Sequence, residues 1–117
     1  MTLKEAYELM GGDYDSAMTL LRKEERVTRY LGMFLKDDSF ALLQSSMEKD
    51  DMETAFRAAH TLKGVTANLS LTRLQQAAGA LTEDLRNGHD IPHAKVAYPD
   101  VAACYEATVA VIRQLIG

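Results

Sequence analysis

Residues 52–85 read METAFRAAHTLKGVTANLSLTRLQQAAGALTEDL, and the spacing of the apolar residues in this stretch decides the fold class. They recur at steps of three and four, which places their side chains along one face of an α-helix. The sequence therefore predicts two amphipathic helices, one from Met52 to about Asn68 and one between Ser70 and Asn87. Their apolar faces consist of Ala55, Ala58, Leu62, Val65 and Leu69 in the first and of Leu71, Leu74, Ala78, Leu81 and Leu85 in the second.

Residues that favour helix ends flank both predicted helices. Asp51 and Ser70 have short, oxygen-bearing side chains that can accept a hydrogen bond from the first turn of a helix. The pair Asn87-Gly88 is typical of a helix C-terminus. We therefore expect Asp51 and Ser70 to be the two N-caps.

The segments before this stretch also have helical patterns. Residues 3–10 are predicted to form a first helix, because Thr2 and Glu5 have the spacing of a capping box. A second helical stretch follows Asp13 and runs to Leu35, with a break near Lys23. A third helix is expected after three N-cap candidates, with three apolar residues on one face. The cap candidates are Asp37, Asp38 and Ser39, and the apolar residues are Phe40, Leu43 and Met47.

The last predicted helix covers Asp100 to Leu115. Its start is left open, because Pro92 and Pro99 each suit the first turn of a helix but not its interior. The apolar stripe of this helix is expected to contain Val101, Cys104, Thr108, Val111 and Leu115.

Amphipathic helices joined by short breaks, without a strand pattern, predict an all-α fold. We expect an antiparallel four-helix bundle core with accessory N-terminal helices. The chain has 117 residues, which is typical of one domain, so residues 1–117 are predicted to form a single domain.

The composition excludes several classes of protein. A net charge of −4 argues against nucleic acid as a partner, since proteins that bind the phosphate backbone usually carry a basic surplus. A single cysteine, Cys104, excludes an internal disulfide framework. No apolar run approaches the roughly 20 residues that span a bilayer, and no signal-peptide pattern opens the chain. We therefore expect a cytoplasmic protein that does not bind membranes.

The face opposite the apolar stripe of residues 52–68 carries the candidate functional residues. His60 lies nearly diametrically opposite the stripe, so the spacing predicts an exposed imidazole. Gly64 lies one turn further on, although glycine inside a helix costs about 1 kcal/mol relative to alanine. Open space beside the imidazole would explain that cost. The other residues of this face include Phe56, Arg57, Lys63 and Ala67.

This arrangement suits a histidine that accepts a charged group from another protein, and a phosphoryl group fits best. Imidazole nitrogen is nucleophilic at neutral pH. Lys63, three residues after His60, can place its ammonium beside a group on the ring and offset its negative charge. Thr82 on the next helix is a further candidate contact to such a group.

The stretch Ala59-His60-Thr61-Leu62-Lys63-Gly64, followed by Ala67-Asn68-Leu69, resembles the signature of histidine-containing phosphotransfer (HPt) domains of bacterial phosphorelays. The resemblance covers the chain from about Leu20 to Gly117. In one departure, Ser70 stands where the family often has glycine, which we expect to alter the turn rather than the chemistry.

The resemblance implies that His60 is phosphorylated, on Nε2, while the spacing on the helix assigns charge stabilisation to Lys63 and steric access to Gly64. It implies that the partners are receiver domains of response regulators and of a hybrid sensor kinase. The receiver would supply the Mg²⁺ and most of the catalysis. The chain itself would then be a carrier with no cofactor of its own, rather than an enzyme. Residues expected to contact the partner are Phe56, Arg57, Ala67 and Thr82.

Two alternatives remain beside this interpretation. The chain could be a helical interaction module that binds a partner through the Phe56/His60 face without phosphotransfer. His89 and His93 have a spacing that resembles metal ligands, but Pro92 lies between them, so a solvated loop without a metal is favoured. We also expect a monomer, because the apolar stripes are used inside the bundle.

Overall fold

The computed structural model describes all residues, 1–117, and the fold is all-α. Seven α-helices and one short 3₁₀ turn follow one another along the chain. They are α1 (Leu3–Met10), α2 (Tyr14–Leu21), α3 (Glu24–Phe34), α4 (Ser39–Glu48), α5 (Met52–Asn68), α6 (Thr72–Leu85), η1 (Arg86–Gly88) and α7 (Ile91–Ile116).

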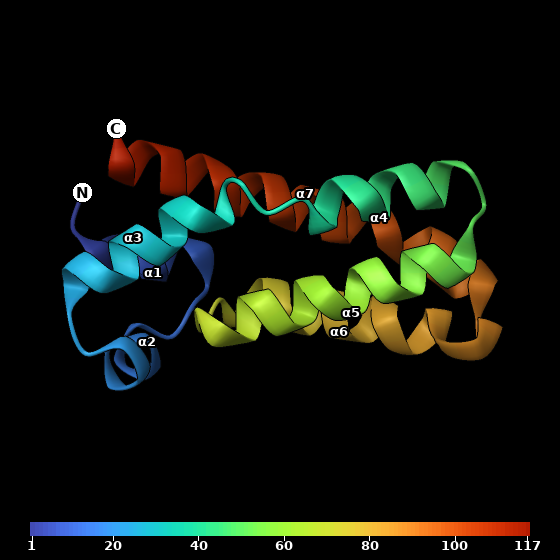
Figure 1. The fold of residues 1–117 in the computed structure, drawn as a ribbon, viewed down its shortest axis with the longest axis horizontal. Helices are drawn as coiled ribbons and strands as arrows, with labels where there is room; N and C mark the ends of the chain where they lie inside the picture. The colour runs from blue at the N-terminus through green and yellow to red at the C-terminus, as the bar shows by residue number, and fades with distance from the viewer.

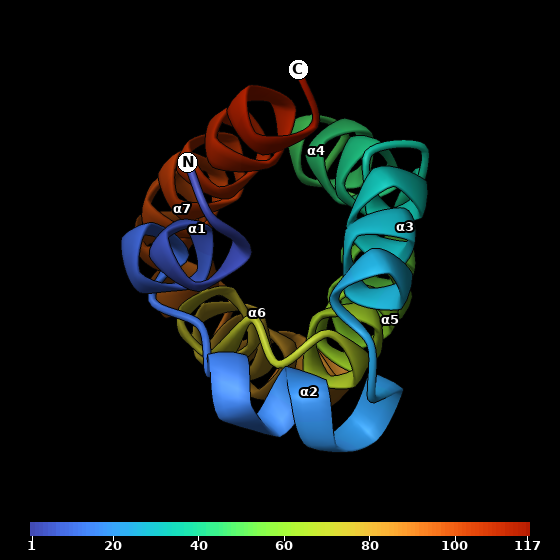
Figure 2. The same ribbon diagram turned by 90° about the vertical axis from the view of Figure 1, so that its left-hand side faces the viewer.

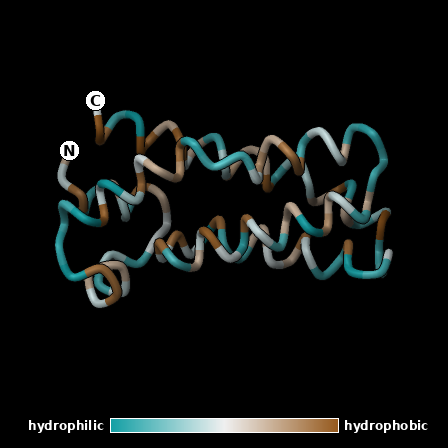
Figure 3. The backbone as a smooth tube through the Cα atoms, viewed as in Figure 1, coloured by the Kyte–Doolittle hydropathy of each residue, from teal (hydrophilic) through white to brown (hydrophobic).

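Helices α4, α5, α6 and α7 form an antiparallel four-helix bundle, as the sequence predicts. Figure 1 shows the four running side by side in alternating directions, with α3 continuing the line of α4 so that the pair matches the length of α7. Helix α5 packs against α4 and α6, and α6 packs against α7. Figure 3 shows that hydrophobic and hydrophilic residues alternate along these helices, which fits one buried and one exposed face on each.

The accessory helices α1 and α2 cover one end of the bundle. Figure 2, which looks onto this end, shows α1 beside α7 and α2 across the ends of α5 and α6. The Tyr7 side chain is fully buried, and its hydroxyl donates to the carbonyl of Leu69 at 2.7 Å. Burial raises the pKa of Tyr7 well above its usual range. This hydrogen bond ties α1 to the C-terminal end of α5.

The loop between α1 and α2 touches the turn between α5 and α6 through its backbone. The amide of Asp13 donates to the carbonyl of Ser70 at 2.9 Å, and the amide of Arg73 donates to the carbonyl of Gly11 at 3.2 Å. A Cβ on Gly12 would lie 2.7 Å from the Tyr7 ring and 2.9 Å from the Ser70 carbonyl oxygen. Only glycine therefore allows so close an approach of the two segments.

The helix ends confirm several predicted caps. The Thr2–Glu5 capping box is present at the start of α1. The Asp51 carboxylate accepts a hydrogen bond from the amide of Thr54 at 3.2 Å, which caps α5. The break predicted near Lys23 separates α2 from α3. Before α4, the Asp37 carboxylate accepts from the amide of Ser39, so it satisfies a donor at this helix start.

The prediction that Ser70 caps the fifth predicted helix is wrong. The N-cap of α6 is Leu71, and Ser70 itself has a φ of 55°, in the left-handed region that favours glycine. Its hydroxyl donates to the hydroxyl of Ser16 at 2.9 Å instead. The Ser70 side chain, which local sequence predicts to cap α6, therefore bonds to α2 instead.

Helix α7 begins before Pro92 and continues through Pro99. Asp90 is its N-cap and accepts from the amide of His93 at 3.1 Å. Pro92 stands in the first turn, where a missing N–H costs nothing. Pro99 lies inside the helix and removes one backbone hydrogen bond at an exposed position.

Two predicted apolar faces need correction in detail. In α7, Val101 and Thr108 are buried as predicted, but Cys104, Val111 and Leu115 are only partly buried. Val109 and Ile112 take their places in the core. In α5, Val65 is only partly buried, while two residues outside the predicted stripe are buried, namely Ala59 and Thr66. None of the helices is both long and apolar enough to cross a lipid bilayer.

Candidate functional site

His60 lies near the middle of α5, on its exposed side, as predicted. Ala58 and Ala59, which precede it, are buried against the rest of the bundle, so the helix cannot turn to bury His60 without losing these contacts. The Asp51 cap and two well-packed neighbours, α4 and α6, hold α5 in place. The bundle thus presents the His60 imidazole from a helix that is capped and packed on two sides.

The imidazole of His60 has no hydrogen-bond or ion-pair partner in the chain. The only histidine ring with such a partner is His93, which contacts Asp84. The ring of His60 instead stacks beside Phe56, with ring centroids 6.2 Å apart and planes inclined by 20°. This leaves both ring nitrogens available to an approaching group, while one flank of the ring is apolar.

Gly64 leaves open space one turn beyond His60. A Cβ placed there would meet no heavy atom within 4 Å, so helix packing does not require this glycine. Ala67, one turn further, is partly buried and small. The approach to the imidazole is therefore free of side chains along this line of α5.

The Lys63 side chain extends from α5 toward α6 and is half-buried. A Cβ on Gly79 of α6 would lie 3.4 Å from Cδ and 3.5 Å from Cε of Lys63, so the lysine stem crosses α6 at this glycine. No carboxylate oxygen lies within 4.0 Å of the Lys63 ammonium, since the salt bridges of the chain are made by other residues. Its charge is thus not neutralised by an ion pair within the chain.

Two arginines on this side of the bundle, Arg57 and Arg86, are both paired with glutamates. Arg57 donates to Glu53 at 3.2 Å on the exposed side of α5. Arg86 donates to both oxygens of Glu83, at 3.1 and 3.0 Å, and its guanidinium carbon lies 4.9 Å from the centroid of the Phe56 ring. Phe56 is therefore only partly exposed, because Arg86 covers one face of it.

Glu83 brings a negative charge to this side of α6. The hydrogen bond from Arg86 lowers its pKa, and the charges of Arg86, Lys63 and His60 lower it further. The local sequence of α5 gives no indication of Gly79, Glu83 or Arg86, because all three come from the next elements. The signal for Gly79 is the same as for Gly64, namely a glycine inside a predicted helix.

Thr82 does not belong to the site, contrary to the prediction. It is fully buried, and its hydroxyl donates to the carbonyl of Ala78 at 2.7 Å. Because its side chain lies in the core between the helices, it cannot contact a group on His60 or a partner protein.

His89 and His93 do not share a loop. His89 is exposed after η1, whereas His93 belongs to the first turn of α7. The Nδ1 atom of His93 lies 2.5 Å from a carboxylate oxygen of Asp84 in α6, and this hydrogen bond raises the pKa of His93. The pair joins the start of α7 to the end of α6.

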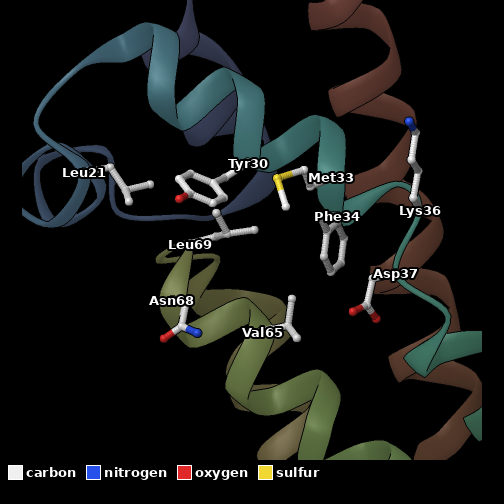
Figure 4. A pocket seen from close by; sticks show the side chains of 9 residues that line it. All are labelled: Leu21, Tyr30, Met33, Phe34, Lys36, Asp37, Val65, Asn68 and Leu69. Carbon is white, nitrogen blue, oxygen red and sulfur yellow. The ribbon is translucent and has the colours of Figure 1, made fainter.

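A mainly apolar groove opens between α3 and α5, further along α5 from His60. Figure 4 shows side chains of both helices and of the α3–α4 connection around it. Its volume is about 440 Å³. The residues that line it are Leu21, Tyr30, Met33, Phe34, Lys36, Asp37, Val65, Asn68 and Leu69.

Comparison with known proteins places these features in one family. The model of the Hpt domain matches residues 29–114, which include the four bundle helices almost completely and His60 near the middle of α5. No curated protein and no solved structure matches the chain. The family match and the exposed histidine of a helical bundle agree with the resemblance of the His60 segment, and the chain belongs to the Hpt domain family.

Proposed function

We propose that the protein is a phosphorelay carrier in two-component signalling. His60 accepts a phosphoryl group from the aspartyl phosphate of a receiver domain and passes it to the aspartate of a response regulator. The observation that carries this proposal is the exposed His60 imidazole without partners, with open space at Gly64 and the unpaired Lys63 beside it.

The transfer needs one nucleophile and an accessible line of approach. A lone pair of a His60 ring nitrogen, Nε2 by the family resemblance, attacks phosphorus while Nδ1 retains its proton. The P–N bond forms as the P–O bond to the donor aspartate breaks, and the electron pair leaves with the carboxylate. The reverse sequence delivers the phosphoryl group to an acceptor aspartate, because a phosphoramidate is labile.

The chain contributes charge and access, and the receiver contributes the rest of the catalysis. The Lys63 ammonium stabilises the negative phosphoryl group more than it stabilises free His60. The Gly64 position allows the receiver to approach the ring. Phe56 and Arg57 precede His60 on α5 and Ala67 follows it two turns later, and these three residues are the proposed contacts of the receiver, whose own site supplies Mg²⁺. The sequence has no glycine-rich phosphate loop of the kind that binds nucleotides.

A labelling experiment tests this proposal. The purified protein is incubated with each of a panel of receiver domains that carry a radiolabelled aspartyl phosphate. We expect label that is acid-labile and base-stable, as phosphohistidine is, and no label with ATP alone. His60→Gln should abolish the label, while His89→Gln and His93→Gln should retain it.

The result also separates the proposal from a plain interaction module. Such a module would bind a partner through the Phe56/His60 face without phosphotransfer, so His60 would carry no label. A receiver that binds the protein but transfers no phosphate, or label that persists in His60→Gln, would contradict the carrier function.

A further inference from the structure

Helix α6 lacks a side chain at the point where the Lys63 stem crosses it. Gly79 lies inside α6, where glycine is less favourable than alanine, and it has no unusual backbone conformation that would require it. The atoms nearest to a Cβ at this position are three carbons of Lys63, at 3.4, 3.5 and 3.8 Å. The aliphatic part of Lys63 therefore lies next to Gly79, at a distance that leaves room for a single methyl group but not for a longer side chain.

The neighbours of Gly79 on α6 determine what the ammonium meets. Glu83 follows one turn later on the same side of α6, and it is the acidic residue whose titration responds to both Lys63 and His60. Arg86 occupies both of its carboxylate oxygens. Glu83 therefore pairs with Arg86, and the Lys63 ammonium forms no ion pair with it.

We propose that Gly79 is a positioning residue for phosphoryl transfer: because no side chain extends beyond the Cβ position there, the Lys63 stem can lie across α6 and hold its ammonium beside His60. This inference rests on the proposed carrier function. A lysine on an open helix face samples many rotamers. Packing its methylene groups against α6 restricts these rotamers before the phosphoryl group arrives. The Glu83–Arg86 pair leaves the ammonium unpaired.

The size of the substituent decides the expected effect. A Cβ at 3.4 Å from Lys63 makes an ordinary van der Waals contact, so Gly79→Ala should leave the lysine in place. The longer side chain of Gly79→Gln continues into the space of the Lys63 methylenes and should displace them. Glutamine also has a higher helix propensity than glycine, so the fold should persist. Ala80→Gln places the same side chain on an exposed neighbour of α6 and is the matched control.

The test combines phosphohistidine lifetime with a double-mutant cycle. The half-life of phosphorylated His60 and the transfer rate to a receiver are measured for Gly79→Gln, Gly79→Ala, Ala80→Gln, Lys63→Ala and the double variant Gly79→Gln/Lys63→Ala. We expect Gly79→Gln to reduce the half-life of phosphorylated His60, the transfer rate or both about fivefold, as Lys63→Ala does, and the control Ala80→Gln to match the wild type. In the Lys63→Ala background Gly79→Gln should have no further effect, since it acts through the lysine.

A second measurement does not depend on phosphorylation. Nuclear Overhauser effects between Hα of Gly79 and the Hδ and Hε protons of Lys63 should be present in the wild type. Their absence would contradict the packing of the Lys63 stem against Gly79. Two outcomes would contradict the inference while the carrier function stands, provided that His60 is labelled. In the first, Gly79→Gln has the same half-life and transfer rate as Ala80→Gln. In the second, Gly79→Gln reduces them by the same factor in the Lys63→Ala background as in the wild type. If neither the wild type nor any variant is labelled, the proposed carrier function itself is contradicted.

Discussion

The junction of α1 and α2 with the bundle and the His60 face of α5 both contain glycine, for opposite reasons. At the junction a Cβ on Gly12 would lie 2.7 Å from the Tyr7 ring and 2.9 Å from a backbone oxygen. At the His60 face a Cβ on Gly64 would meet nothing within 4 Å. The first glycine permits packing, and the second permits access. Substitutions at the junction should therefore change stability, and those at the His60 face should change phosphotransfer.

The largest effect on stability is expected at Tyr7. Tyr7→Ala removes a fully buried aromatic ring and the hydrogen bond to the Leu69 carbonyl, which should lower the free energy of unfolding by about 3–5 kcal/mol. Urea unfolding measures this loss. Phosphotransfer below the unfolding transition should stay close to wild type, because Tyr7 is remote from His60. A folded Tyr7→Ala protein with lost transfer would mean that the junction also shapes the site.

A smaller loss is expected at Gly12. Gly12→Ala forces its Cβ against a backbone oxygen that cannot easily move, which should cost about 1–3 kcal/mol in thermal or urea unfolding. Gly32→Ala in α3 is the control, because its Cβ would lie at an ordinary 3.6 Å from Ile116. Helix propensity predicts that this control is stabilised by up to about 1 kcal/mol. Equal effects of the two substitutions would refute the packing role of Gly12.

The His60 face should respond in the opposite way. Gly64→Ala should stabilise the protein by up to about 1 kcal/mol, because the added methyl group raises helix propensity and meets no neighbour. Gly64→Gln should slow phosphotransfer about tenfold or more by obstructing the receiver, with the helix intact. Melting temperature and transfer rate are measured on the same samples. Transfer at the wild-type rate in Gly64→Gln would remove the argument for access.

The smallest effect concerns pH and the His93–Asp84 pair. Because the folded-state pKa of His93 is raised by Asp84, the pair contributes its stability fully below the unfolded pKa of about 6.5. That contribution disappears as the pH rises through the higher folded-state pKa. The melting temperature of His93→Gln should therefore fall below that of the wild type at about pH 5.5 and approach it at about pH 8.5. A constant difference across this range would show that the pair does not titrate.

Much of the site could be predicted from the sequence pattern of α5 alone. The period of apolar residues in α5 places Ala55 and Leu62 inside, and geometry then places His60 outside. The same period places Gly64 on the exposed side of α5, but it does not predict which atoms lie around Gly64. Thr82 shows the limit of this reasoning. It stands beside the predicted stripe of α6, and the packing of α6 between α5 and α7 buries it.

Tertiary contacts decided the other departures from prediction. Ser70 is a good N-cap by residue type, but docking of α2 and the α1–α2 loop holds it in a left-handed conformation and bonds its hydroxyl to Ser16. Pro99 would end an isolated helix, yet α7 continues through it because packing on both sides of the interruption outweighs one missing hydrogen bond.

The sequence by itself determined most of the helices, the bundle class and the exposed imidazole, because these depend on spacing along one chain segment and on the preferences of single residues. Only the tertiary structure decided which residues of α6 and η1 meet α5. It placed Gly79 under Lys63 and Arg86 between Glu83 and Phe56. The physical reason is that the register between two helices is set by how their side chains interlock, which no periodicity within either helix specifies.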